Sequence, residues 1–231
     1  MFRRSLVLVP TVSLFCALTI SATMAAETPA LKVAQEKSAQ EKPIVLQAAA
    51  NVAGFRSAQF GMDEAAVRAA IAKDFGTQEK AITKTQNLAD RTTVLAIKAP
   101  EVLASGGTAD IAYILGYKSK KLTQVNIVWA KATDQSLDAE KLLANGESLR
   151  TYFGTQGYDP KTIVSNVEVR DGILLFRGAD AEGRTTALML HGTKTAATDK
   201  AASVFTPDGL LLFYLANAKE PDVYRIPNGK F

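Results

Sequence analysis

The chain has 231 residues, with 27 lysine and arginine residues against 23 aspartate and glutamate residues, one histidine and one cysteine. No basic stripe with interleaved aromatic side chains runs through it, which argues against a nucleic-acid-binding protein. The single cysteine excludes an intrachain disulfide and a site built from several thiolates.

Residues 1–26 have the three-part pattern of a secretory signal. Arg3 and Arg4 precede an apolar stretch over residues 6–20, and small alanines follow near the expected cleavage point. The stretch is shorter than the roughly 20 apolar residues that span a bilayer. We therefore expect a cleaved signal peptide, a periplasmic or secreted mature protein, and no transmembrane span in the mature chain.

Cleavage changes the charge and thiol content of the protein. Removal of Arg3 and Arg4 leaves 25 basic against 23 acidic residues, a net charge of +2. Cys16 lies inside the signal and follows Phe15, whereas a lipoprotein signal has a small residue before its cysteine. The mature chain is thus expected to carry neither a thiol nor a lipid anchor.

Residues 27–52 are rich in Ala, Gln, Lys and Glu and contain no aromatic residue. Such a composition buries little apolar surface, and it predicts a flexible leader. The remaining residues, 53–231, are expected to fold as one α+β domain.

The first half of this domain predicts a helix followed by three strands. Asp63 is a typical N-cap, Val67, Ile71 and Phe75 form an apolar stripe, and Gly76 ends the helix. Alternating apolar residues then predict strands at 91–98, 108–115 and 121–129, the last two joined as a hairpin through the turn at 116–120.

The second half predicts the same order. A helix is expected over residues 138–153, with Gly146 as a weak point, and strands at 172–177, 184–191 and 210–216. The fold class is therefore α+β, with tandem helix-plus-three-strand units whose helices pack on one face of an antiparallel sheet. The expected repeats are 53–131 and 134–217, and residues 218–231 form a C-terminal tail.

One family resemblance rests on the first helix and hairpin. The helix start Gly61-Met62-Asp63, with Val67 following, resembles that of the β-lactamase-inhibitory-protein and small outer-membrane-assembly lipoprotein (SmpA/OmlA) superfamily. The hairpin with Tyr113, Gly116, Leu122 and Val125 is also similar to that family's pattern. The resemblance implies small helix-on-sheet modules, used in tandem, that bind other proteins.

Two motifs invite a chemical interpretation. His191 is the only histidine, so a metal site would need carboxylate ligands from elsewhere, and a catalytic triad would lack the usual Gly-x-Ser-x-Gly turn. A histidine at a strand end is the simpler interpretation. The turn at 178–183 contains Asp180 and Glu182, too few ligands for a calcium loop, and it predicts an ordinary hairpin turn.

Lys118, Lys120 and Lys121 crowd the first hairpin turn. This weak basic turn suits either contact with anionic headgroups or an acidic partner, or the protection of a sheet edge.

Strand parity predicts the binding surface. Because side chains alternate between the faces of a strand, Val125, Ile127 and Trp129 share the buried face, and Gln124 and Asn126 take the other. The same argument in the later strands puts Leu174 and Phe176 together, opposite Arg177, and turns His191 outward. The candidate partner-binding residues are Gln124, Asn126, Arg177 and His191.

The sequence thus favours a non-enzymatic, exported protein-binding module, either an envelope-assembly accessory or an inhibitor, whose partner is another envelope or secreted protein. No cofactor fingerprint is present. The alternative is a periplasmic carrier or sensor of a small lipid or metabolite, held between helices and sheet. A hydrolase with paired Asp or Glu residues is a third hypothesis.

Overall fold

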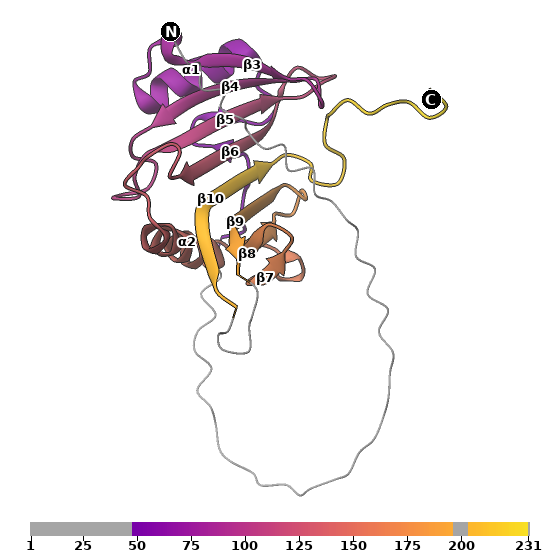
Figure 1. The fold of residues 1–231 in the computed structure, drawn as a ribbon. Coiled ribbons are helices and arrows are strands. Elements are labelled where there is room, and N and C mark those ends of the chain that lie inside the picture. Colours follow the sequence, from indigo (N-terminus) through magenta and orange to yellow (C-terminus); the bar gives the residue numbers. More distant parts are fainter. Residues whose placement is uncertain (1–47, 196–202, 231) are drawn as a thin grey trace, which may run out of the picture. The chain divides into compact units, whose positions relative to one another are not determined.

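The computed structural model describes residues 48–195 and 203–230. The predicted signal peptide and residues 27–47 of the predicted leader lie outside these ranges. Two helices, two short 3₁₀ turns and ten strands follow one another (Figure 1): β1 Gly54–Phe55, β2 Ala58–Gln59, α1 Glu64–Phe75, η1 Glu79–Ala81, β3 Thr83–Asn87, β4 Thr92–Ala99, β5 Ala109–Leu115, β6 Leu122–Ala130, α2 Ala139–Gly154, η2 Pro160–Thr162, β7 Val167–Val169, β8 Gly172–Ala179, β9 Thr185–Lys194 and β10 Phe205–Leu215.

One antiparallel sheet of eight strands organises the domain, in the order β3-β4-β5-β6-β10-β9-β8-β7. Each half of the chain gives a helix followed by four of these strands, and the two halves join through their last strands. In that central pairing Ile127 lies opposite Leu212, and Trp129 opposite Leu210. The predicted α+β class, with helices packed on an antiparallel sheet, is confirmed.

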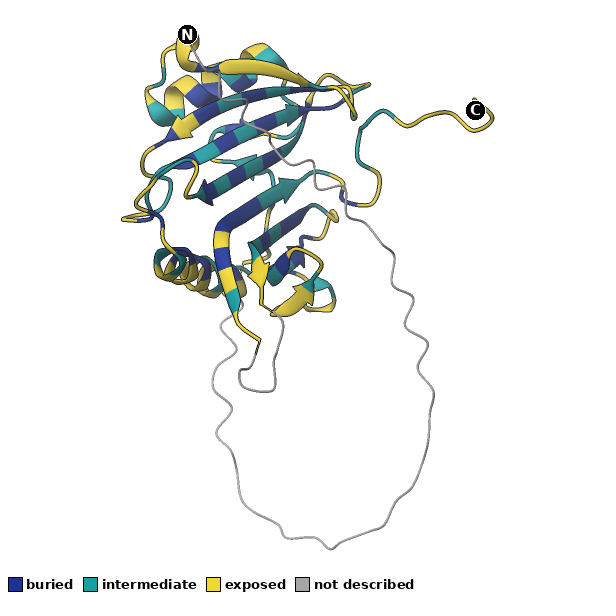
Figure 2. Cartoon of the chain, viewed as in Figure 1, coloured by how far each residue is buried: buried dark blue, intermediate teal, exposed yellow. Residues whose placement is uncertain are grey.

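Each half contains one edge strand that the sequence did not predict. In β3, Thr83 to Gln86 are exposed, and Figure 2 shows this strand as the exposed border of the sheet. The other edge, β7, has only three residues. Edge strands pair on one side only and bury little, so they show no apolar alternation and escape a search based on periodicity.

Helix α1 begins and ends where the sequence predicts. The Asp63 carboxylate accepts a hydrogen bond from the Ala66 N–H at 3.0 Å, and Gly76 ends the helix in the left-handed conformation at φ 61°. Val67 and Ile71 are completely buried, while Phe75 is half-buried. The apolar stripe is therefore the face that packs on the sheet.

Helix α2 starts at Asp138, whose carboxylate accepts a hydrogen bond from the Lys141 N–H at 2.8 Å. Helix α2 runs without a break through Gly146, which the sequence predicts as a weak point. A Cβ atom at this position would lie 2.7 Å from Leu175 Cδ1 and 3.4 Å from Leu210 Cδ1. The glycine is thus where α2 approaches the sheet closely, and its missing side chain makes that approach possible.

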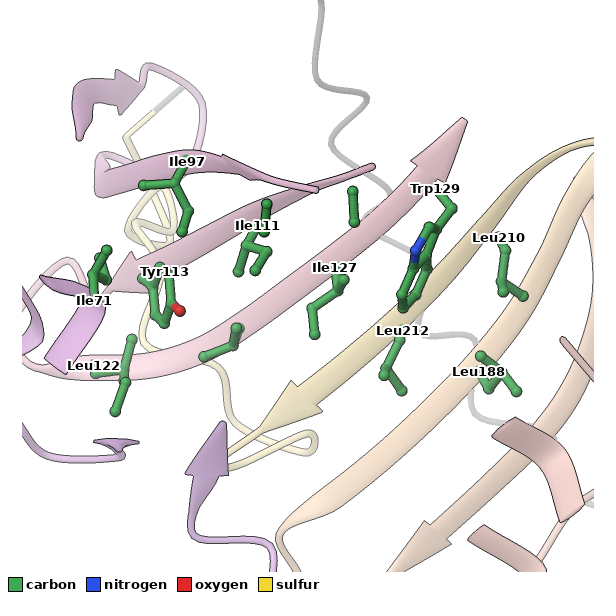
Figure 3. Close-up of a cluster of buried hydrophobic side chains, with 14 of the residues drawn as sticks. Ile71, Ile97, Ile111, Tyr113, Leu122, Ile127, Trp129, Leu188, Leu210 and Leu212 are labelled. Carbon is green, nitrogen blue, oxygen red and sulfur yellow. The ribbon is translucent and has the colours of Figure 1, made fainter. Parts of the chain in front are cut away.

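The core is a cluster of buried side chains on one face of the sheet, part of which Figure 3 shows. Trp129 and Tyr113 are its largest fully buried side chains; Trp129 lies beside Ile127 and Leu212, and Tyr113 lies near Ile71 and Ile111. Among the described residues, the Tyr113 hydroxyl and the Trp129 indole N–H have no hydrogen-bond partner. Burial raises the pKa of Tyr113, so its hydroxyl stays neutral.

The folded domain begins earlier than expected. Residues 48–52 were assigned to the flexible leader, yet Val52 is buried, and its N–H donates to the Asp180 carboxylate at 2.9 Å. The Ala50 N–H also donates to the Gly157 carbonyl at 2.9 Å. Ala50 and Val52, which the composition assigns to the leader, thus contact partners more than 100 residues away, and local composition cannot reveal such contacts.

The C-terminal tail folds back on the hairpin turns. The Asp222 carboxylate accepts hydrogen bonds from the N–H groups of Lys118 and Ser119, both at 2.9 Å. Tyr224 donates its N–H to Asp90 at 2.8 Å and lies under the Arg91 guanidinium, 3.6 Å from the ring centre. The tail therefore ties the β3–β4 turn to the β5–β6 turn.

Neither α1 nor α2 is long and apolar enough to cross a membrane.

Candidate functional site

The sheet face opposite the helices, here called the open face, carries the candidate site. Along β5 and β6 its side chains alternate with the fully buried ones, as the bands of Figure 2 show, whereas β10 is buried at four consecutive positions, 209–212. Because the core side chains take the helix face, the pairing register assigns these residues to the open face: Val94, Ala96, Lys98, Asp110, Ala112, Ile114, Gln124, Asn126, Val128, Leu174, Arg177, Ala187, Met189, His191, Leu211, Phe213 and Leu215.

Most of these outward positions are apolar. One cross-strand row consists of Val128, Leu211, Met189 and Leu174 on four adjacent strands. The solvated face of an antiparallel sheet is usually polar, with apolar side chains turned to the core. Leu211 is buried, at 9% exposure, and the other three are partly buried. A continuous apolar face on the side away from the helices suits contact with another molecule.

A second row brings two of the predicted site residues into line. Asn126 pairs with Phe213, Phe213 with Ala187, and Ala187 with Arg177. Three strand spacings separate Asn126 from Arg177, which is about 14 Å at about 4.8 Å per spacing. The register thus places both polar side chains on the open face, with apolar residues between them.

Gln124 and Asn126 form a polar pair at the middle of this face. They are two residues apart on β6, and the Gln124 Nε2 donates to Asn126 Oδ1 at 2.7 Å. Both side chains are half-exposed.

A β-bulge determines how Arg177 is presented. The β8–β9 register shifts between Leu174 and Phe176, so that Leu174 pairs with Met189 on the open face and Phe176 with Leu188 on the helix side. The prediction that Leu174 and Phe176 share a face is therefore wrong, because the extra residue inverts the alternation. Arg177 keeps its predicted outward position.

His191 lies near the edge of the open face, at the bulge of β10. Its Nδ1 is 2.5 Å from Asp208 Oδ1, and both side chains are about half-exposed. The β10 register shifts between Pro207 and Gly209, which turns Asp208 toward His191. The sequence did not predict this partner, since a bulge leaves no mark in the alternation.

The three lysines of the basic turn make contacts within the domain. Lys121 Nζ is 3.5 Å from Asp63 Oδ2, and Lys120 Nζ is 5.3 Å from the centre of the Tyr117 ring. The backbone of Lys118 holds Asp222. These contacts give the turn a structural role in joining α1 and the tail to the sheet.

Several carboxylates also serve as local caps. Hydrogen bonds from the Thr108 N–H and from Ser136 lower the pKa of Asp134 to about 2. Burial raises the pKa of Asp180, but hydrogen bonds from the Val52 N–H and Arg184 outweigh it and hold that pKa below its usual value. Within residues 48–195 and 203–230, no three His, Cys, Asp or Glu side chains are grouped to hold a metal ion.

Alternation in β9 predicts Ala187 and Met189 as outward apolar neighbours of His191, and their pairing with Phe213 and Leu211 agrees with this. The same argument assigns no residue of β10, because the run from Leu210 to Leu215 is apolar on both parities. The double-sided apolar pattern of β10 was the available signal, because a strand covered on one face only does not need it. No family model, curated protein or solved structure matches the chain.

Proposed function

We propose that the mature chain is a non-enzymatic protein-binding module of the periplasm or the extracellular medium, acting as an envelope-assembly accessory or an inhibitor, and that the open face is its binding surface. The observation that carries this proposal is the apolar row of Val128, Leu211, Met189 and Leu174, which lies on the face of four adjacent strands away from the helices and is partly buried. Interface cores combine such apolar area with a few polar anchors.

The anchors are the four predicted residues. Gln124 and Asn126 lie near the centre of the face, Arg177 lies in the row of Asn126, and His191 lies beside Asp208. A partner that covers the face would remove the apolar row from water, and the polar groups would fix its orientation.

The alternative, a carrier of a small ligand between helices and sheet, has one observation in its favour. The unpartnered Tyr113 hydroxyl and Trp129 N–H lie in that layer and would gain from a polar ligand. The surrounding side chains, such as Ile127 and Leu188, are fully buried, however, so a ligand there would have no open path to its site. The protein-binding proposal needs no rearrangement of this core.

Affinity capture tests the proposal. The mature chain, immobilised, is exposed to an envelope extract of its source cells and compared with the variants Met189→Asp and Phe213→Asp, whose side chains lie on the open face. Leu143→Asp is the matched control, since Leu143 is 44% exposed on helix α2 on the other side of the domain. Capture should be lost with both open-face variants and kept with the control.

Arg177→Ala and His191→Ala refine the test. Each should weaken capture of the same protein while the thermal midpoint stays within a few degrees of the wild type. Equal capture by all variants, or equal loss with Leu143→Asp, would remove the open face as the binding surface.

A further inference from the structure

The carboxamide pair at the centre of the open face has a defined recognition chemistry. The bond between Gln124 Nε2 and Asn126 Oδ1 uses one donor and one acceptor, and the Gln124 oxygen and the Asn126 amino group have no hydrogen-bond partner among the described residues. If both amides are turned round, the pair again presents one acceptor beside one donor. A neutral amide, which offers one donor and one acceptor itself, matches this arrangement better than a carboxylate or a cation.

Arg177, at the far end of the same row, is positively charged and therefore favours an anionic group in place of a neutral amide. Among the described residues it takes part in no ion pair and its guanidinium makes no hydrogen bond, unlike Arg68, Arg150 and Arg184, which are all paired. A half-buried guanidinium beside apolar residues is a strong binder of carboxylates, because it donates two parallel hydrogen bonds.

The surface between these anchors is neutral. Phe213 and Ala187 occupy the two intervening positions of the row, and Leu211 and Met189 lie beside them. Phe213 and Ala187 are both partly buried and uncharged. A span of about 14 Å corresponds to roughly four residues of extended chain at about 3.3 Å each.

A second copy of the chain does not fit this surface. Its open face would have to bring a free carboxylate to Arg177, but Asp110 is 3.8 Å from Lys98 and bonded to the Thr133 hydroxyl, while Asp208 is held by His191. Charge complementarity therefore favours a different protein as the occupant.

We infer that the open face binds an extended segment of another protein, which runs across the strands with a free amide group over Gln124 and Asn126, apolar side chains over Phe213 and Ala187, and an Asp or Glu at Arg177. The inference rests on the proposed function and names the chemistry of its partner. Specificity comes from the ends of the row, and most of the contact area comes from its middle.

Selection from a library of random octapeptides displayed on phage tests the inference. The mature wild-type chain should enrich peptides with an Asp or Glu following apolar residues. The charge-reversed Arg177→Glu variant should enrich Lys or Arg at that position instead, because the same site then presents a carboxylate. Lys118→Glu, the same reversal on the hairpin turn, should leave the wild-type preference unchanged.

Binding of one selected peptide to purified protein then locates the contact. Gln124→Ala with Asn126→Ala should weaken binding about tenfold, as should Arg177→Ala, since each removes a hydrogen-bonded anchor. Phe213→Asp should abolish binding, and Leu143→Asp should leave the dissociation constant unchanged. Thermal midpoints close to that of the wild type exclude unfolding as the cause.

Several outcomes overturn the inference. They are an absence of enriched peptides, an acidic preference that survives Arg177→Glu, or a dimer in sedimentation that Arg177→Glu dissociates. Peptides that lose binding with Phe213→Asp yet show no acidic preference also reject it, but they leave the proposed function standing. The proposed function itself fails if capture from the envelope extract persists with Phe213→Asp and Met189→Asp, or if it is lost equally with Leu143→Asp.

Discussion

The Asp180 carboxylate accepts a hydrogen bond from the N–H of Val52, 128 residues earlier in the chain. The same carboxylate accepts from the Glu182 and Arg184 N–H groups, and it pairs with the Arg184 guanidinium at 2.7 Å. Its side chain is only 1% exposed. One buried acid thus closes the β8–β9 turn and fixes the start of the folded domain to it.

Replacement of this acid should be costly. In Asp180→Ala the Val52 N–H loses its partner in a buried position and Arg184 loses its counterion, so the free energy of unfolding should fall by about 2–4 kcal/mol. Denaturant unfolding measures the change. Glu182→Ala, in the same turn and with a side chain that is 70% exposed, should change it by less than about 0.5 kcal/mol. Similar losses in both variants would show that the turn, and not the buried acid, matters.

The boundary of the folded domain can be found by truncation. A chain that begins at residue 48 keeps every described contact, whereas one that begins at residue 53 lacks the buried Val52 side chain and its bond to Asp180. Thermal unfolding should therefore show a midpoint about 5–10 °C lower for the shorter chain. Equal midpoints would return residues 48–52 to the leader.

Two glycines of α2 should respond in opposite ways to a side chain. Gly146→Val adds atoms where a Cβ would already lie 2.7 Å from Leu175, so overpacking should cost about 1–3 kcal/mol. Gly154→Ala should stabilise the helix by up to about 1 kcal/mol, since nothing lies within 4 Å of its Cβ position. Denaturant midpoints of the two variants compare them, and a stabilising Gly146→Val would contradict the close packing.

Acid should release the C-terminal tail. Burial raises the pKa of Asp222, but hydrogen bonds from Ser119 and the Lys118 N–H outweigh it and hold the pKa below the ordinary 3.8. Because the folded pKa is lowered, the ionised carboxylate stabilises the tail above pH 3.8, and this contribution is lost as the pH falls through the folded pKa. The Tyr224 amide resonance should then move toward its free position.

An Asp222→Ala variant is the control for this titration, since it lacks the titrating group. Its Tyr224 amide should already be near the free position at pH 6 and should change little on acidification. A wild-type resonance that stays fixed down to pH 2 would mean that Arg91 and the Asp90 carbonyl hold the tail without Asp222.

The local elements were largely readable from the sequence. Asp63 and Asp138 mark helix starts because each carboxylate accepts a hydrogen bond from the N–H group three residues later. Both partners of such a bond lie within four consecutive residues, so the sequence shows them together. The inward set Val125, Ile127 and Trp129 followed from alternation, since a strand buried on one face repeats every two residues. These features depend on neighbours in the chain, so the sequence alone determined them.

The arrangement of these elements depended on distant pairs. The β6–β10 pairing, the bulge that separates Leu174 from Phe176, and the Val52–Asp180 bond leave no local pattern. The row from Asn126 to Arg177 exists only because four strands align in one register, and a shift of one residue would turn each side chain to the other face. The sequence therefore determined which side chains point outward on each strand, while the tertiary structure alone decided which of them lie together, because hydrogen bonding between strands sets the register.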